Sequence, residues 1–102
     1  MKAQALLAEL LGTFLFFSVI LSTISSDKNE CSSSFLAPIA IAVGLLAAIY
    51  FGGKISGGHF NPAVSIMMFF KGNIPLITAI GYIISQIIGG LLALLVNSLL
   101  IV

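Results

Sequence analysis

The stretch GGKISGGHFNPAVSIMMFFKG, residues 52–72, is apolar enough to enter a lipid bilayer, but it begins with glycines and polar residues that a membrane-crossing helix would not have. This first half has little helical propensity. The nine residues from Pro62 onward form an apolar run, which as a helix would measure about 13.5 Å, roughly half the hydrocarbon thickness. Asn61 is a preferred N-cap, and proline suits the first helical position. We therefore predict a re-entrant loop and half-helix over residues 56–70.

Three apolar runs surround this segment, and Glu9 is the only acidic residue within them. Each comes close to the roughly 20 residues that a helix needs to cross a bilayer core. A stretch rich in serine and charge, SSDKNECSSS at residues 25–34, is typical of a solvated loop. The sequence thus predicts an all-α membrane protein, a single unit over residues 1–102, with one re-entrant half-helix and three transmembrane helices at about residues 5–24, 36–51 and 74–95.

Small residues recur every four positions in the last two predicted spans. This spacing lets helix backbones approach closely. We interpret both series as contact faces between helices, without direct chemistry: Ala40, Gly44, Ala48 and Gly52 in one, and Gly81, Ser85, Gly89 and Ala93 in the other.

Composition excludes several classes of function. Hydrophobic residues make up 60% of the chain and charged residues only 7%, too few to solvate a compact globule. A net charge of +1 without arginine gives no footprint for nucleic acid. The single cysteine excludes an internal disulfide and a multi-cysteine metal site, and no catalytic set of residues is evident. We expect a lipid-embedded protein that is not an enzyme and holds no cofactor or metal.

The lysines predict the orientation of the chain. Lys2, Lys54 and Lys71 would lie on one side of the membrane and Lys28 on the other. Because cytoplasmic loops carry an excess of cations, the N-terminus is expected in the cytoplasm. The expected location is the plasma (inner) membrane, as a multi-pass protein.

The predicted loop has the chemistry of a pore. Non-helical backbone survives at membrane depth only where protein buries it or where it lines a watery cavity. The Asn61 amide could donate hydrogen bonds there, and the carbonyls of Gly57, Gly58 and His59 could accept them. The positive end of the half-helix would oppose cations, which favours a path for water or small polyols. The alternative is an ordinary cap before an amphipathic helix on the membrane surface.

The segment SGGHFNPAVS, residues 56–65, resembles the major intrinsic protein family, the aquaporins and glycerol facilitators. Three further segments resemble the family's first helix, the end of its second and its third: AELLGTF at 8–14, AIYFGG at 48–53 and GYIISQIIGG at 81–90.

The resemblance assigns roles to single residues. It implies that Asn61 donates to the permeating molecule at the pore centre and that Pro62 and Ala63 pack against a second Asn-Pro-Ala loop. It also implies that Glu9 braces the backbone of the pore loop, with Gln86 near that loop. The alternative for Glu9 is a carboxylate near the cytoplasmic interface. His59 is expected to brace the loop, and Tyr82 is interpreted as packing.

The chain also departs from the family pattern. Family members have six spans and two such loops built as inverted repeats, whereas this sequence matches the first repeat only. A channel would need a second half, supplied by an inverted copy in a homo-oligomer or by a complementary chain. The sequence could also be a fragment of a longer channel, or a structural or regulatory remnant that does not transport. Three lysines against one disfavour dual orientation.

Selectivity is expected to differ from that of full-length relatives. Val64 stands where the family's second repeat has an arginine of the narrow filter, and Ile41 aligns with a filter residue of the second helix that is often aromatic. A pore built from two such halves would discriminate by size and apolarity more than by a charged donor. We expect it to be less strict between water and small neutral solutes.

Overall fold

The computed structural model describes residues 2–25 and 36–100. Within these ranges the chain is helical, without strands, which confirms the predicted all-α fold class. Residues 26–34 of the predicted polar loop lie outside the described residues. The helices are α1 (Ala3–Ser25), α2 (Leu36–Ser56), α3 (Pro62–Lys71) and α4 (Leu76–Leu100).

Three of the helices are long and apolar enough to cross a membrane. α1, α2 and α4 contain 23, 21 and 25 residues, so at 1.5 Å per residue each exceeds a hydrocarbon core of about 30 Å. α3 has only 10 residues and spans about 15 Å. The protein is therefore an integral membrane protein with three spans and one helix of half that length.

Several helix boundaries differ from the predicted spans, among them the end of α4, which lies at Leu100 instead of position 95. α2 continues beyond position 51 to Ser56, through two glycines of low helical propensity. Close packing at Gly52, described below, overrides that propensity. α4 starts at Leu76 instead of position 74, because Pro75 disfavours helical backbone at the residue before it.

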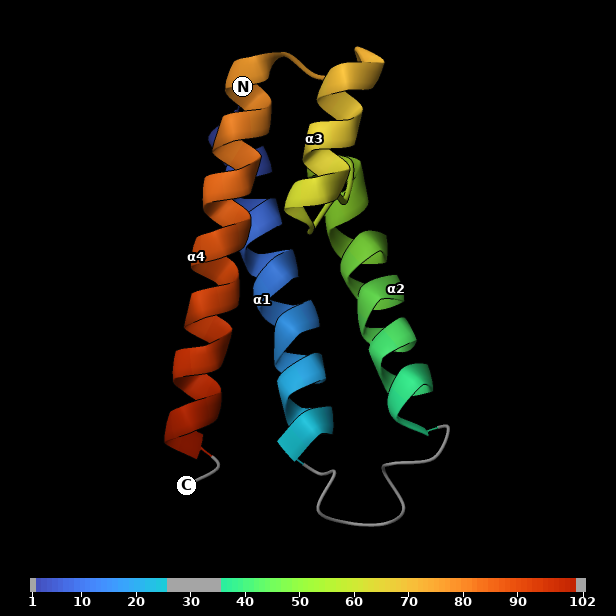
Figure 1. The fold of residues 1–102 in the computed structure, drawn as a ribbon, viewed down its shortest axis with the longest axis vertical. Helices are drawn as coiled ribbons and strands as arrows, with labels where there is room; N and C mark the ends of the chain where they lie inside the picture. Colours follow the sequence, from blue (N-terminus) through green and yellow to red (C-terminus); the bar gives the residue numbers. More distant parts are fainter. Residues whose placement is uncertain (1, 26–35, 101–102) are drawn as a thin grey trace.

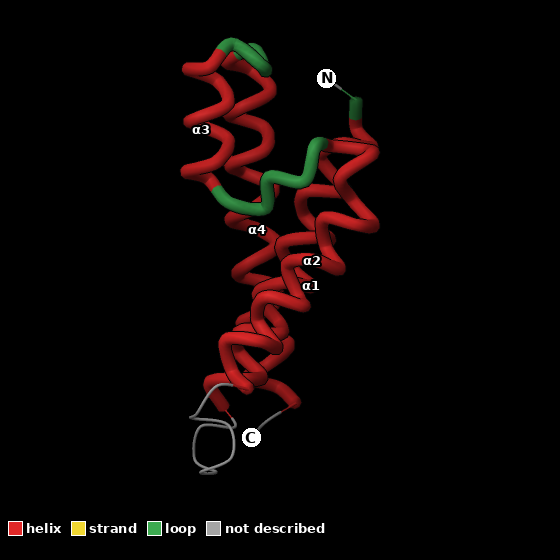
Figure 2. Tube along the Cα trace, turned by 90° about the vertical axis from the view of Figure 1, so that its right-hand side faces the viewer, coloured by secondary structure: helices red, strands yellow, loops and turns green. Residues whose placement is uncertain are grey.

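α1 occupies the middle of the bundle, with α2 on one side and α4 on the other, and α3 packs beside α4 (Figure 1). After α2 ends, the chain turns back down into the bundle before α3 rises again to the level where α4 begins (Figure 2). α3 runs alongside α4. A helix on the membrane surface would instead lie across the end of the bundle. This path gives the molecule its re-entrant segment.

Small residues form the contacts of α1 with its neighbours, as predicted, although Ala40 is exposed and faces α1 across a hollow. The middle members of both series, among them Gly44, Ala48 and Gly89, are buried. A Cβ built on Gly44 would lie 3.1 Å from the Val19 side chain, and one on Gly89 would collide with the carbonyl oxygen of Leu10. The backbones can pack this closely only because these side chains are small or absent.

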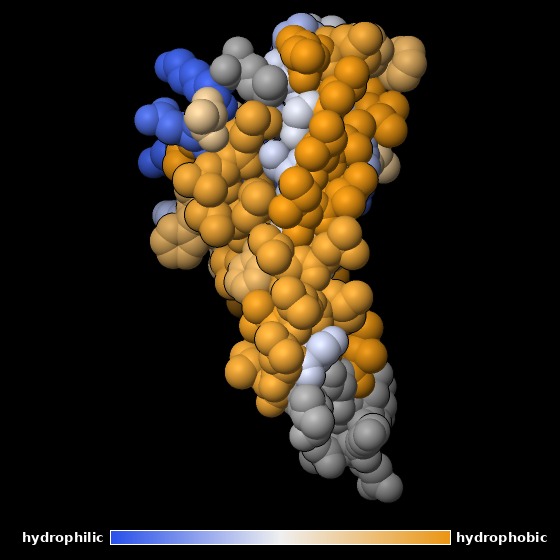
Figure 3. Space-filling view, turned by 90° about the vertical axis from the view of Figure 1, so that its left-hand side faces the viewer, coloured by the Kyte–Doolittle hydropathy of each residue, from blue (hydrophilic) through white to orange (hydrophobic). Residues whose placement is uncertain are grey.

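The lateral surface of the bundle is apolar. In Figure 3, hydrophobic residues cover most of the visible face, and hydrophilic residues gather at the end where α1 begins. In the most apolar 18-residue stretches of α1, α2 and α4, only 22%, 17% and 33% of the residues are buried within the chain itself. The remaining surface must be covered by lipid or by other protein.

Candidate functional site

The candidate site is the loop of residues 57–61 together with the first turn of α3. The Gly57 N–H donates to the Gly53 carbonyl at 2.8 Å and closes α2. Gly57 and Gly58 then adopt φ values of 95° and 68°, a backbone conformation that glycine reaches at no steric cost. The Gly58 N–H donates to Ser56 Oγ at 3.2 Å. These two glycines turn the chain back into the bundle.

α3 begins and ends with well-formed caps. Asn61 has extended backbone (φ −158°), and its Oδ1 accepts from the Ala63 N–H at 2.8 Å, with Pro62 at the first helical position. The predicted N-cap is therefore confirmed. At the other end, Gly72 has φ 90°, and its N–H donates to the Phe69 carbonyl at 3.0 Å. The half-helix thus presents its electropositive N-terminus at the deepest point of the loop.

Glu9 of α1 binds the loop through hydrogen bonds. Its side chain is 0% exposed. Oε2 accepts from Ser56 Oγ at 2.6 Å and from the His59 N–H at 3.1 Å. Oε1 accepts from the Phe60 N–H at 2.8 Å and from Gln86 Nε2 at 2.8 Å. One carboxylate, buried inside the bundle, therefore ties the end of α2, the loop and α4 to α1.

A second layer of hydrogen bonds joins the loop to α3 and α4. His59 Nδ1 lies 2.8 Å from Ser65 Oγ, which also accepts from Gln86 Nε2 at 3.0 Å. The Tyr82 hydroxyl donates to the Ser56 carbonyl at 2.6 Å, and its ring packs edge-to-face on His59 with centroids 5.0 Å apart. The interpretation of Tyr82 as packing was therefore incomplete, because its hydroxyl also binds the end of α2.

The loop leaves a set of polar atoms without protein partners. Asn61 is exposed, and within the described residues its Nδ2 has no acceptor, since only its Oδ1 is used by the cap. Among those same residues, no donor reaches the carbonyl oxygens of Gly57, Gly58 or His59. The arrangement can therefore offer one donor group and several acceptors to a small polar molecule.

The other predicted residues lie at different distances from this point. Ala63 is exposed, and Pro62 and Val64 are half-buried in the first turn of α3. Ile41 is half-buried in the second turn of α2, near the end of that helix opposite the loop. The structure therefore gathers the loop residues, Glu9 and Gln86 into one cluster, but leaves Ile41 outside it.

Sequence reasoning missed Phe60, the residue just before Asn61. Phe60 is 0% exposed and has φ 52°, a conformation that is an outlier for a bulky residue. A Cβ built on Gly12 would overlap its ring. One available signal was a large apolar residue in a loop otherwise made of small and polar ones, and another was a glycine inside a predicted span.

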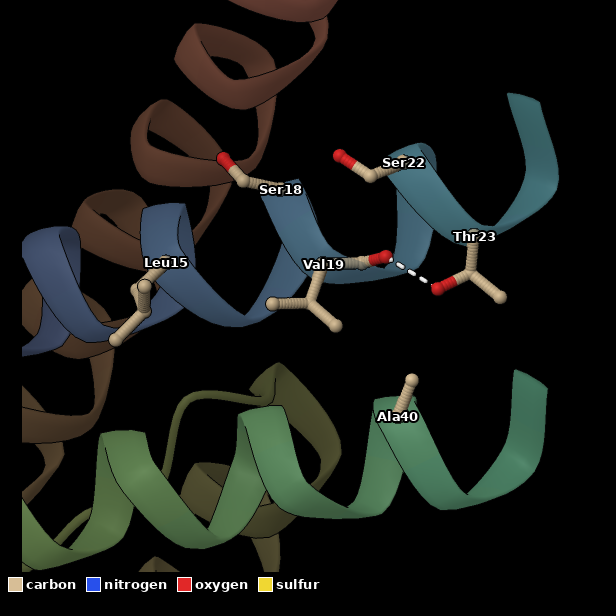
Figure 4. Close-up of a pocket in the computed structure, with 6 residues that line it drawn as sticks. All are labelled: Leu15, Ser18, Val19, Ser22, Thr23 and Ala40. Carbon is tan, nitrogen blue, oxygen red and sulfur yellow. Dashed lines mark hydrogen bonds between the residues drawn. The ribbon is translucent and has the colours of Figure 1, made fainter. Parts of the chain in front are cut away.

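Of the hollows that adjoin the described helices, one lies near the loop and a second, larger one lies away from it. One, of about 280 Å³, lies beside the start of α3 and is lined partly by Pro62 and Gln86. The other, of about 380 Å³, lies between the C-terminal half of α1 and α2, away from the loop (Figure 4). There the Thr23 hydroxyl donates to the Val19 carbonyl of its own helix at 2.7 Å. The first hollow therefore belongs to the candidate site and the second does not.

Comparison with known proteins identifies relatives along most of the chain. It is 46% identical to aquaporin Z of Photorhabdus laumondii over 94 residues, which cover 88% of this chain and 40% of that protein. It is 44% identical to glycerol uptake facilitator protein-like 6 of Lactiplantibacillus plantarum, covering 85% and 39% respectively. It is 39% identical to probable aquaporin TIP5-1 of Oryza sativa, covering 91% and 37%.

The chain thus spans about 40% of the length of these relatives. No solved structure matches it. Its relatives are channels rather than enzymes, in agreement with the expectation that the chain has no catalytic role. The model of the major intrinsic proteins matches residues 1–102, and the chain belongs to that family.

Proposed function

We propose that this chain forms half of a channel through which water and small neutral solutes such as glycerol cross the membrane. The observation that carries the proposal is the loop that returns into the bundle and ends on Asn61, exposed and with its Nδ2 unpaired among the described residues. The channel proteins among its relatives support this reading, since they include both an aquaporin and a glycerol uptake facilitator.

The polar atoms of the loop suit an uncharged solute. A molecule that leaves bulk water must replace its lost hydrogen bonds, and the Asn61 amide with the free carbonyls of Gly57, Gly58 and His59 can do so. The positive end of α3 disfavours cations at the same point. Because Glu9 already accepts four hydrogen bonds from protein groups, it does not present a carboxylate to the path.

We further propose that a second half completes the pore. The relatives are longer than this chain, which matches only 40% of aquaporin Z. The hollow of about 280 Å³ beside Pro62 and Gln86 offers space where a second Asn-Pro-Ala loop would meet Pro62 and Ala63. The second half is another copy of this chain in an inverted homo-oligomer, a complementary chain or, where this sequence is a piece of a longer channel, the remainder of that channel.

Orientation and selectivity follow from the same proposal. Lys2, Lys54 and Lys71 lie at the starts or ends of helices that meet at one end of the bundle (Figure 1). We infer that this end, and with it the N-terminus, faces the cytoplasm of a plasma (inner) membrane. With Ile41 and Val64 as filter residues, the pore would pass glycerol as well as water, because neither side chain supplies a charged donor.

Permeability of reconstituted protein tests the proposal. The chain alone and a chimera, in which it replaces the matching region of P. laumondii aquaporin Z, are inserted in liposomes and followed by light scattering under water and glycerol gradients. We expect Asn61→Asp to reduce permeability in any conducting assembly, because it places a carboxylate at the pore centre. Asn73→Asp, the same change at an exposed position beyond α3, is the matched control and should have no effect.

Two outcomes decide between the alternatives. If the correctly inserted chimera is no more permeable than empty liposomes, the channel proposal is wrong, and a structural or regulatory half that does not transport is favoured. If the chimera conducts and the chain alone does not, a complementary second half is favoured over an inverted homo-oligomer.

A further inference from the structure

Phe60 combines three features that a loop residue rarely shows together. Its side chain is 0% exposed. Its backbone has φ 52°, which is costly for a residue with a large side chain and persists only where surrounding structure enforces it. It directly precedes Asn61, the residue that starts α3.

Two glycines on different helices form a socket for the Phe60 ring. A Cβ on Gly12 of α1 would overlap ring atoms Cε1 and Cζ. A Cβ on Gly52 of α2 would lie 2.8 Å from Cζ, closer than Cβ atoms pack, and 3.4 Å from Cε1. By contrast, a Cβ on the neighbouring Gly53 would make only an ordinary contact of 3.6 Å with Ile49. The ring therefore fills space that only glycine leaves open.

We propose that Phe60 is a positioning residue for Asn61, and that the socket of Gly12 and Gly52 sets how deeply Asn61 lies in the bundle. The Phe60 N–H is fixed on Glu9 Oε1 at 2.8 Å, and its ring is fixed between α1 and α2. A single peptide bond connects this clamped residue to Asn61. A carbon added to either glycine would overlap the ring where it now stands, so it must displace the ring, the loop or a helix.

The proposal predicts a graded rescue. Gly52→Ala displaces the Phe60 ring, and Phe60→Leu, which lacks the Cζ and Cε1 atoms, restores the position of Asn61 in the double variant. Gly12→Ala is rescued only in part, because Cδ1, 2.7 Å from the added carbon, has a counterpart in leucine. Gly53→Ala is the matched control, since it adds the same methyl to the same turn of α2 without touching the ring.

The position of the loop is read without transport, from the accessibility of a cysteine in the first turn of α3. Ala63→Cys is introduced with Cys31→Ser, and its rate of reaction with a membrane-impermeant methanethiosulfonate is measured in liposomes. We expect Gly52→Ala to change this rate by at least about threefold relative to Gly53→Ala, and Phe60→Leu to return it to the parent value. In an assembly that conducts, the ratio of glycerol to water permeability should shift and recover in the same order.

Several results would overturn the proposal. One is a Gly52→Ala variant with a lower melting temperature but an unchanged reaction rate, which would make the socket merely structural. Another is a double variant, Gly52→Ala with Phe60→Leu, whose reaction rate differs from the parent value as much as that of Gly52→Ala alone. If Gly52→Ala does not fold, a double variant that also fails to fold would overturn the proposal. The inference rests on the site of the proposed channel. The reaction rates of the cysteine test it independently of transport. If wild-type protein conducts nothing, only the channel proposal fails.

Discussion

Glu9 shows how a single buried side chain sets the geometry of the loop. Four donors converge on its two oxygens, and three of them come from residues 47 to 51 positions away in sequence. Buried donors need partners, and a carboxylate can accept all four at once because it carries no hydrogen of its own. The loop therefore depends on one acid contributed by α1.

Glu9→Gln should destabilise the protein because its amide nitrogen would face donors that have lost their acceptor. Leaving such groups unpaired costs at least about 2 kcal/mol. Unfolding in mixed detergent measures the loss. Gln4→Glu, the reverse change at an exposed position of the same helix, serves as the control. Equal stability of Glu9→Gln and the parent protein would contradict the assignment of Glu9 as the acceptor for the loop.

Tyr82 offers a second test at the scale of a residue. Tyr82→Phe keeps the ring on His59 but removes the hydroxyl that binds the Ser56 carbonyl, and the expected loss of unfolding free energy is about 1 kcal/mol. Tyr50 is 79% exposed, so Tyr50→Phe should leave stability unchanged. Identical effects of the two substitutions would show that the hydroxyl bond does not stabilise the loop.

Sequence reasoning reached these residues unevenly. The Asn61 cap follows from neighbouring residues, so the sequence alone predicts it. The contact between Glu9 and the loop depends on tertiary folding and was expected only through the family resemblance. Phe60 and its glycine socket depend on how closely three segments approach one another, which neither periodicity nor motif reveals.

α3 illustrates how a short helix is stabilised at both ends. Asn61 caps its start, and Gly72 ends it in the left-handed conformation with φ 90°. Ten residues are too few for an isolated helix to be stable in water, so these caps and the contact with α4 must hold it. The loop and α3 therefore depend on each other for their stability.

Replacing glycine by alanine should destabilise the protein at the end of α3 and stabilise it within α2. Gly72→Ala meets no neighbour within 4 Å but must adopt a left-handed backbone, which costs roughly 1 kcal/mol. Gly53→Ala lies within helical α2, where alanine is favoured over glycine by about 0.5–1 kcal/mol. Hydrogen exchange of the α3 and α2 amides reports each effect locally. Destabilisation by both, or by neither, would contradict the backbone assignments.

The element boundaries show where local signals fail. Glycine propensity predicts that α2 stops near position 51, yet the helix runs to Ser56 because Gly52 is needed where the Phe60 ring packs. At the start of α4, the rule for residues before proline is local, and the structure follows it at Pro75. Tertiary packing therefore extends α2 beyond the end that local propensity predicts. The start of α4 lies close to its predicted position because it is set by local steric effects.

At the scale of the whole molecule, the bundle exposes a belt of apolar side chains and carries its described lysines at one end. We expect a single orientation in the membrane. An impermeant maleimide should label native Cys31 in intact cells. In a Cys31→Ser background, Asn73→Cys should react only after the membrane is permeabilised. Labelling of both positions in intact cells would contradict a single orientation and favour an inverted homo-oligomer.

The central claim is that the start of α3 lies deep in the membrane and yet is reached by water. Spin labels at Ala63, Met67 and Asn73, all exposed in this chain, allow depth to be measured by collision with oxygen and with a water-soluble nickel chelate. We predict that the label at Ala63 is the deepest of the three but remains accessible to the chelate, with Met67 intermediate and Asn73 at the headgroups. Three labels all at headgroup depth would contradict the re-entrant loop and the channel built on it.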